Sequence, residues 1–212
     1  MKKIYKKVLF MGRKNDEYSH QMISILKRKF KFLQVYLDEK KNHKLDKKTF
    51  KWRGDLIICF RSYFILNEKF ISKAKLGAIN FHPGPPNYRG IGCVNFALLK
   101  NEKEYGATLH LIDNKIDHGA IIDFRLFKIS KKDSIRSVLE KTYKIQIEQL
   151  NQLIKNLIIK KFNLNLLIKN KKWSKKLYLR KNLEQLYKIK NNITKSEFKK
   201  IIRATNTEKF KP

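Results

Sequence analysis

The chain has 212 residues and an apolar fraction of 42%, which suits one globular domain with an appendage and excludes extensive disorder. Its two cysteines, Cys59 and Cys93, stand in apolar or glycine-flanked stretches without the spacing of metal ligands. We therefore expect buried thiols, no bound metal ion and a location in the reducing cytoplasm. No apolar run is long enough for a signal peptide or a membrane span, so we expect no contact with a membrane.

The net charge of +32 raises the question of nucleic-acid binding, because cationic surfaces attract phosphate. The excess is nearly all lysine, and lysine, isoleucine and asparagine are all abundant, as an AT-rich coding bias would produce. The charge is also spread out: residues 1–150 carry 32 Lys and Arg against 15 acids, and residues 151–212 carry 18 against 3. We favour compositional bias, with attraction to phosphorylated or nucleic-acid ligands as the alternative.

The first half of the chain alternates short apolar runs with amphipathic ones, a pattern typical of βαβ units in a parallel sheet. In chain order we expect a strand at 7–12, a helix at 20–30, a strand at 32–37, a variable connection with one short helix at 38–53, a strand at 55–60, a helix near 67–74 and a strand at 78–82. The continuous apolar character of 55–60 and 78–82 indicates the central strands of the sheet, buried on both faces.

The second half begins with two more strands and continues as helices. The expected elements are strands at 106–112 and 119–124, a polar turn at 113–118, a long helix from a capping box at Ser130 to Asp133 as far as residue 158, and tail helices at 182–189 and, after a capping box at Thr194 to Glu197, at 198–204. We predict an α/β fold with an open, mostly parallel sheet of Rossmann-like topology over residues 1–160. A short, basic, mainly helical extension follows over residues 161–212.

The segment that indicates chemistry spans residues 78–90, read together with residues 116–119. Residues two apart on a strand face the same side, so Asn80 and His82 would project together at a strand's carboxyl end, where open α/β sheets bind ligands. An amide and an imidazole held side by side both donate to an oxygen that becomes negative during acyl transfer. Asp117, brought from a neighbouring loop, would position a water, make the histidine more basic and relay a proton. These residues alone indicate acyl or one-carbon transfer among several options.

Three spaced motifs make the prediction more specific. Asn80-Phe-His82-Pro-Gly-Pro-Pro-Asn-Tyr-Arg-Gly90, Gly106-Ala-Thr-Leu-His110 and Ile116-Asp117-His-Gly119 together resemble the 10-formyltetrahydrofolate-dependent formyltransferase family. The resemblance implies the formyltransferase variant of the fold, with Asn80 and His82 as the pair that binds the oxyanion and transfers the proton, and Asp117 as the catalytic aspartate. It also implies that the pterin ring of the folate lies against the backbone of Arg61, Ser62, Tyr63 and Phe64 and against the segment from Ile112 to Ile116.

The other polar residues near these motifs have weaker cases. His110 shares a strand face with Thr108 and Ile112, so it either lines the pocket or fills a buried structural position. Asp113 is typical of a turn, and His118 of an exposed loop. Tyr88 and Arg89 either touch substrate or stiffen the proline-rich loop, and we do not expect them to be catalytic.

The expected acceptor follows from features that the sequence lacks. The first strand is not followed by the glycine- and serine-rich phosphate loop of a glycinamide ribotide transformylase. The residues after the long helix have a helical pattern that does not suit the C-terminal β-barrel of a methionyl-tRNA formyltransferase, and we expect no N-terminal regulatory domain like that of formylfolate hydrolases. The loop after His82 and the tail sequence Ile202-Arg203-Ala204 are similar to the branch that formylates nucleotide-linked amino sugars.

We therefore expect a cytoplasmic transferase that moves a formyl group from 10-formyltetrahydrofolate, its co-substrate, to the amine of a nucleotide-linked amino-deoxysugar for polysaccharide biosynthesis. The expected partners are the folate, the sugar nucleotide and a second copy of the chain, with no nucleic acid and no membrane. Three alternatives stay open: a methionyl-tRNA formyltransferase-like protein, an RNA binder that has kept the fold, and an inactive shell that serves as an interaction module.

Overall fold

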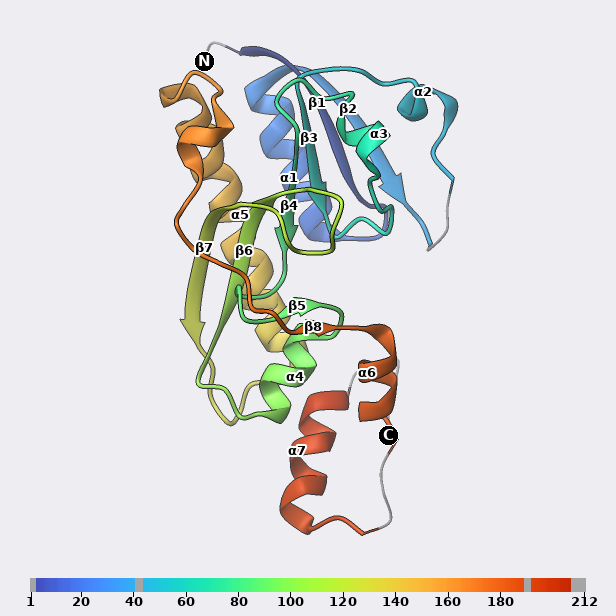
Figure 1. Ribbon diagram of the computed structural model, residues 1–212, viewed down its shortest axis with the longest axis vertical. Helices are drawn as coiled ribbons and strands as arrows, with labels where there is room; N and C mark the ends of the chain where they lie inside the picture. Colours follow the sequence, from blue (N-terminus) through green and yellow to red (C-terminus); the bar gives the residue numbers. More distant parts are fainter. Residues whose placement is uncertain (1–2, 41–43, 189–191, 207–212) are drawn as a thin grey trace. The chain divides into compact units, whose positions relative to one another are not determined.

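A computed structural model describes residues 3–40, 44–188 and 192–206 of the chain (Figure 1). Its elements are, in chain order, β1 (Ile4–Arg13), α1 (Glu17–Lys29), β2 (Phe30–Asp38), α2 (Lys47–Phe50), β3 (Leu56–Phe60), α3 (Glu68–Ile71), β4 (Ala78–His82), β5 (Arg89–Gly90), α4 (Cys93–Leu99), β6 (Glu104–Leu111), β7 (Ile121–Lys128), α5 (Ile135–Ile159), the 3-10 helix η1 (Leu164–Leu167), β8 (Leu177–Tyr178), α6 (Arg180–Leu186) and α7 (Lys195–Thr205).

The chain divides into two compact units, each assembled from three separate stretches of sequence. Unit 1 comprises Met1–His82, Leu109–Asp123 and Gln146–Asn170, and unit 2 comprises Pro83–Thr108, Phe124–Ile145 and Lys171–Pro212. The strands β6 and β7 and the helix α5 each pass from one unit into the other. The predicted boundary after residue 160 stays a prediction.

Unit 1 is built on a sheet with the strand order β2-β1-β3-β4-β6-β7, to which it contributes the end of β6 and the start of β7. The strands β1 to β4 pair in parallel. Ile112, just after β6, donates its N–H to the carbonyl of Ala78 at the start of β4 at 2.8 Å, and His110 of β6 contacts Asn80 further along β4, so β6 runs opposite to β4. The predicted fold class, an open and mostly parallel α/β sheet with β3 and β4 at its centre, is confirmed.

The parallel register gathers several chain segments at one edge of this sheet. Cys59 pairs with Asn80 and Phe60 with Phe81, so the segment that starts at Arg61 leaves β3 beside the end of β4. In the same way, Arg13 at the end of β1 pairs with Asp38 at the end of β2. Because parallel strands all end at the same edge, polar residues that follow one strand meet those that follow another.

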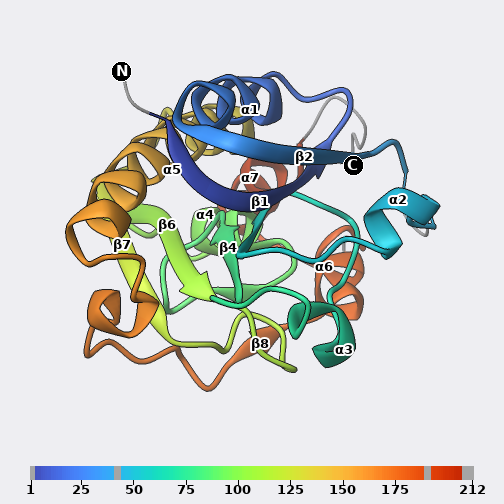
Figure 2. The same cartoon turned by 90° about the horizontal axis from the view of Figure 1, so that it is seen from above.

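Helices cover both faces of the sheet of unit 1. Figure 2 shows α1 on one side of β1 and β2, and α2 and α3 on the other. One core cluster joins Leu9, Ile57 and Cys59 of the sheet to Trp52, just after α2, and to Phe70 of α3. All five residues of β3 are buried, which explains why this strand is a continuous apolar run rather than an alternating one.

Most predicted elements are found with shifted bounds, and one predicted cap is wrong. The first predicted helix begins earlier, after Asp16, whose carboxylate accepts from the N–H of Ser19 at 2.8 Å. The helix α5 is not capped by the stretch from Ser130 to Asp133. It begins after Ser134, whose Oγ accepts from the N–H of Ser137 at 3.2 Å, while the Oγ of Ser137 accepts from the N–H of Ser134 at 3.0 Å. Part of the predicted connection at 38–53 lies outside the described residues.

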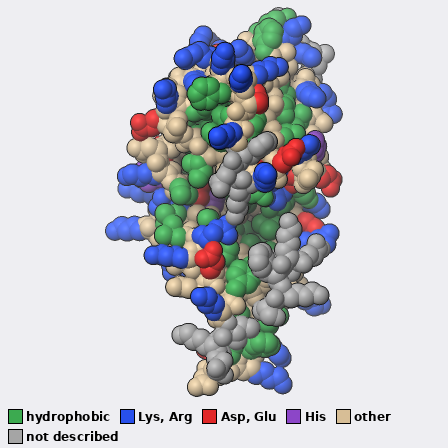
Figure 3. Space-filling model, turned by 90° about the vertical axis from the view of Figure 1, so that its right-hand side faces the viewer, with side chains coloured by type: hydrophobic (Ala, Val, Ile, Leu, Met, Phe, Trp, Pro, Cys, Tyr) green, Lys and Arg blue, Asp and Glu red, His purple; other side chains and the backbone are tan. Residues whose placement is uncertain are grey.

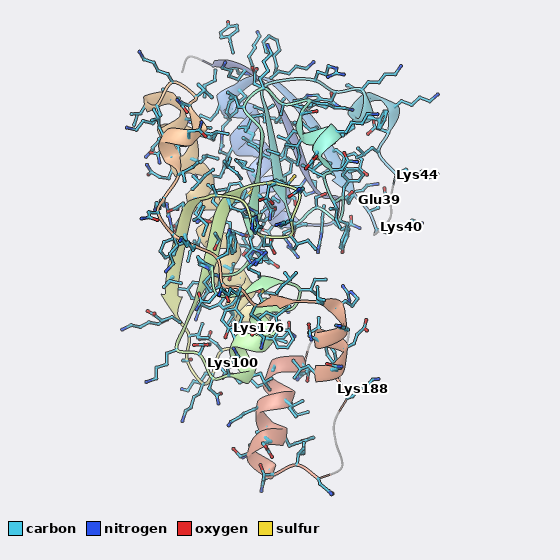
Figure 4. All side chains as sticks on the ribbon, viewed as in Figure 1. Glu39, Lys40, Lys44, Lys100, Lys176 and Lys188 are labelled. Carbon is cyan, nitrogen blue, oxygen red and sulfur yellow. The ribbon has the colours of Figure 1, made fainter. Side chains whose placement is uncertain are left out.

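A stack of aromatic rings organises unit 2. Tyr178 of β8 stacks on Phe96 of α4 with ring centroids 4.1 Å apart and on Tyr88 with centroids 5.8 Å apart. The ammonium groups of Lys100 and Lys176, both labelled in Figure 4, lie 5.9 and 5.0 Å from the centre of the Tyr178 ring. The pairing of β5 with β8 that supports this stack was not predicted, because strands of two residues carry no periodic signal.

The predicted tail helices are present as α6 and α7, and the reciprocal cap of Thr194 and Glu197 is confirmed. Arg203 of α7 donates to the carbonyl of Ser130 at 2.6 Å, to the carbonyl of Asp133 at 3.0 Å and to Oδ1 of Asn101 at 3.3 Å. The arginine of the tail motif therefore fixes α7 to other parts of unit 2.

The surface is strongly basic, and its charge is dispersed. Figure 3 shows lysine and arginine side chains scattered over the visible face, with apolar and other side chains between them. No helix in the described part of the chain has both the length and the apolar character needed to cross a membrane.

Candidate active site

The strand β4 presents Asn80 and His82 together. Its residues alternate, so Ile79 and Phe81 are buried in the core on one side while Asn80 and His82 share the other. His82 is only 3% exposed and Asn80 is half-buried. The prediction that the two side chains face the same way is confirmed.

Asp117 reaches His82 from the loop between β6 and β7. Its Oδ2 lies 3.1 Å from Nδ1 of His82, and its Oδ1 lies 3.5 Å from Nε2 of His110. The backbone of Asp117 is left-handed with φ of 42°, a strained conformation for a residue other than glycine. Two residues later, Gly119 lies so close to the carbonyl of Leu111 that a Cβ would overlap it. This sharp turn carries the carboxylate back to the two histidines.

The carboxylate of Asp117 is largely buried, with 11% of the side chain exposed, and it is ionised. Burial alone would raise its pKa, but the charge of His82 and hydrogen bonds from His110 and His82 hold the pKa of Asp117 well below its usual value. An ionised carboxylate only accepts hydrogen bonds, so Nδ1 of His82 carries the proton in this contact. Nε2 is then the ring nitrogen through which His82 would meet a substrate.

His110, whose role the sequence left open, belongs to this cluster. Its Nδ1 lies 2.6 Å from the carbonyl of Leu111 and therefore carries a proton. Its Nε2 lies 3.1 Å from Nδ2 of Asn80 and 3.5 Å from Oδ1 of Asp117, so the ring connects the amide to the carboxylate. The antiparallel register of β6 against β4 brings His110 and Asn80 together, and no motif in the sequence reveals that register.

The segment from Arg61 to Phe64 begins at the same edge of the sheet. Phe64 and Ile112, both expected near the folate ring, pack against the same core cluster, which includes the register neighbour of Asn80, Cys59. Ile116 is 50% exposed on the loop that carries Asp117. The structure therefore places all these residues in unit 1. Their predicted roles in binding folate, like the catalytic roles of Asn80, His82 and Asp117, stay predictions.

A second aspartate and histidine on the same loop form a contrast to the buried pair. Nδ1 of His118 lies 2.6 Å from Oδ2 of Asp113, but both side chains are exposed.

Tyr88 and Arg89 are bound within unit 2, where Tyr88 donates to Glu102 at 2.7 Å and Arg89 donates to the carbonyl of Ser174 at 3.1 Å. Within the described residues, no group of three or more His, Cys, Asp or Glu side chains is arranged to hold a metal ion.

Known proteins are similar to this chain in sequence and in fold. The methionyl-tRNA formyltransferase of Enterococcus faecalis is 39% identical over 88 residues, which is 41% of this chain and 28% of that protein. A 4-N formyltransferase from Francisella tularensis has a TM-score of 0.75 at 19% identity and covers 96% of this chain and 90% of its own. An N-formyltransferase from Helicobacter canadensis, solved in complex with folinic acid and dTDP-3-aminofucose, has a TM-score of 0.68 at 23% identity, with coverage of 93% and 80%.

The chain spans well under half the length of the curated relatives it matches. The match to the family itself is much broader. Residues 6–154, which include the whole Asn80, His82, His110 and Asp117 cluster, fit the formyl transferase family, and the chain is a member of that family.

Proposed function

We propose that the protein transfers a formyl group from 10-formyltetrahydrofolate to the primary amine of a nucleotide-linked amino-deoxysugar. The observation that carries the proposal is the buried cluster in which an ionised Asp117 contacts His82 and His110 beside the amide of Asn80. Membership of the formyl transferase family supports the reaction type.

The proposed reaction follows from the polarity of these groups. The amine nitrogen attacks the formyl carbon and forms the new C–N bond, and the carbonyl oxygen becomes an oxyanion. Asn80 Nδ2 would donate to this oxyanion, and His82 Nε2 would be the second donor once its lone pair has taken the proton lost by the amine. The bond between the formyl carbon and N10 of the folate then breaks as His82 Nε2 passes that proton to N10. Asp117 would hold the imidazole in one tautomer and stabilise its cation.

The folate is proposed to lie against the backbone of the segment from Arg61 to Phe64. This segment leaves β3 beside the end of β4, where Asn80 and His82 stand. A ring placed there would bring its formyl group within reach of both side chains. The solved complex of the similar Helicobacter canadensis enzyme with folinic acid supports a formyl-folate as the donor.

The acceptor is the less constrained part of the proposal. The structurally similar proteins from Francisella tularensis and Helicobacter canadensis are N-formyltransferases, and the latter was solved with a dTDP-linked amino sugar. The similar Enterococcus faecalis protein acts, by its name, on methionyl-tRNA. We favour the amino sugar because likeness to these two N-formyltransferases, one of them solved with dTDP-3-aminofucose, extends over nearly all of this chain. Methionyl-tRNA is the second candidate.

The test is a formyl-transfer assay with 10-formyltetrahydrofolate and four classes of acceptor: dTDP-linked amino sugars, UDP-linked amino sugars, methionyl-tRNA and glycinamide ribotide. We expect turnover with one amino sugar and a loss of at least about a hundredfold in His82→Ala. The matched control is His118→Ala, which removes an exposed histidine from the neighbouring loop and should leave turnover unchanged.

Each outcome of this assay bears on a different part of the proposal. Turnover of methionyl-tRNA alone would overturn the acceptor and keep the chemistry. Turnover that survives in His82→Ala would overturn the assignment of the site. Absence of turnover with every acceptor, together with absence of folate binding, would identify an inactive member of the family.

A further inference from the structure

The segment from Arg61 to Phe64 is tied down by residues that no sequence motif singled out. Asp38, the last residue of β2, is 2% exposed. Its Oδ2 accepts from the hydroxyl of Ser62 at 2.5 Å, from the N–H of Tyr63 at 2.6 Å and from the N–H of Phe64 at 3.3 Å. The hydroxyl of Ser62 also accepts from the N–H of Phe64 at 3.1 Å. One buried carboxylate therefore holds three consecutive residues.

Arg61 is held from the other side, by residues at and after the end of β1. Its guanidinium bonds to Oδ1 of Asp16, and its carbonyl accepts from Nε of Arg13 at 2.6 Å. The guanidinium of Arg13 lies 3.9 Å from the centre of the Tyr63 ring. These contacts stabilise the left-handed backbone of Arg61, whose φ is 56°.

The burial of a carboxylate to this degree costs free energy, because a charged group loses its hydration when it leaves water. This cost is large for a group that would serve only to shape an ordinary loop. The three donors of Ser62, Tyr63 and Phe64, all on Oδ2, offset part of that cost, and only while the segment keeps its present conformation. Asp38 therefore favours one backbone arrangement of the segment over all others. A ligand that binds this arrangement would not have to order the segment itself.

We propose that Asp38 is a positioning residue of the enzyme: by fixing the backbone of residues 62–64 it pre-forms the surface on which the formyl-folate lies. The proposal rests on the proposed function, which places the folate on this segment. It assigns Asp38 an effect on the binding of folate and not on the chemical step, because Asp38 contacts neither Asn80 nor His82 in any hydrogen bond that the structure gives within its described residues.

The expected effect of losing Asp38 is a change in the KM for 10-formyltetrahydrofolate. If loss of the carboxylate leaves the segment in its binding conformation in about a tenth of the molecules, the apparent Kd for folate rises about tenfold. We expect Asp38→Ala to raise the KM for 10-formyltetrahydrofolate by about tenfold or more. The kcat at saturating folate and the KM for the acceptor should stay within about threefold of the wild type.

Three further variants separate positioning from a general loss of stability. Asp38→Asn keeps an acceptor oxygen of the same size, so it should recover most of the affinity lost in Asp38→Ala. Asp46→Asn is the matched control, because Asp46 also accepts from a backbone N–H and a hydroxyl, both of Thr49, at 2.8 and 2.7 Å, but at the start of α2. It should leave folate affinity unchanged. Ser62→Ala removes one donor and provides a milder variant should Asp38→Ala fail to fold.

Calorimetric titration with folinic acid, which needs no acceptor, separates this proposal from the one on which it rests. Binding by the wild type that weakens in Asp38→Ala and Ser62→Ala, but not in Asp46→Asn, supports the positioning role. Equal binding by folded Asp38→Ala or folded Ser62→Ala and by the wild type would overturn the role of Asp38 and leave the proposed function standing. A wild type that does not bind folinic acid would overturn both.

Discussion

Replacement of Asp117 by asparagine tests the chemistry of the cluster most directly. The amide has the size and shape of the carboxylate but carries no charge, so the loop should keep its turn while His82 loses its ionised partner. A hydrogen bond to a charged group contributes about 1.5–3 kcal/mol, against about 0.5–1.5 kcal/mol for a neutral one, and a positioned proton-transfer group contributes about 10²–10⁴-fold in rate. We expect kcat of Asp117→Asn to fall by about 10²–10⁴-fold.

The pH dependence of the rate and of the stability should change in a definite direction in this variant. The pKa of Asp117 is depressed, so its carboxylate is ionised at every pH at which the enzyme would be assayed. In Asp117→Asn the cationic form of His82 loses an opposite charge, so the acid limb of the rate profile should move to lower pH. A depressed carboxyl pKa also contributes stability that is present above the unfolded value of about 3.9 and lost as the pH falls below it. Acid should therefore destabilise the wild type more than the variant.

The assay is steady-state formyl transfer measured from about pH 5.5 to 9, the range in which histidines titrate, with folding checked by circular dichroism. Asp113→Asn is the matched control, because it removes the exposed aspartate of the same loop. A kcat for Asp117→Asn within about threefold of the wild type, or an equal loss in Asp113→Asn, would show that the buried pair does not carry the proton transfer.

Three further predictions concern the rest of the structure. Burial, and secondarily the charge of Asp38, raise the pKa of the Cys59 thiol to about 12, so iodoacetamide should label Cys59 only after unfolding; mass spectrometry that finds it labelled in the native protein would contradict this. Arg203→Ala should lower the free energy of unfolding by about 1–3 kcal/mol, measured by urea denaturation, because three acceptors lose their donor; an unchanged midpoint would argue against its anchoring role. Ile58→Ala, fully buried in β3, should cost about 2–5 kcal/mol, and a loss below about 1 kcal/mol would mean that this strand is not central.

The sequence predicted those features that depend on neighbours along the chain. The apolar run at β3 and the alternation in β4 located the central strands, and the spacing of Asn80 and His82 predicted that they face the same way. The turn at Asp117 was recognised from a local motif. Such features follow from the two-residue and 3.6-residue periods of strands and helices, which are visible without a structure.

Features that depend on register or on distant pairing were not predicted. His110 joins the cluster only because β6 runs opposite to β4, and the contacts of Asp38 with residues 62–64 connect the ends of β2 and β3, which are not adjacent in the sheet. The start of α5 was misplaced because Ser130 and Asp133 match the capping pattern at least as well as Ser134 and Ser137 do. In each case competing local signals are similar, and packing decides between them.

The way in which the two units share the chain has a consequence for how the protein is made. Unit 1 takes its last stretch from Gln146–Asn170, so a nascent chain cannot complete the unit that holds Asn80 and Asp117 until residue 170 has left the ribosome. A single break in the chain cannot separate the two units, because the stretches of one unit alternate with those of the other along the sequence. Biosynthesis therefore delays the assembly of this unit until its third stretch has been translated.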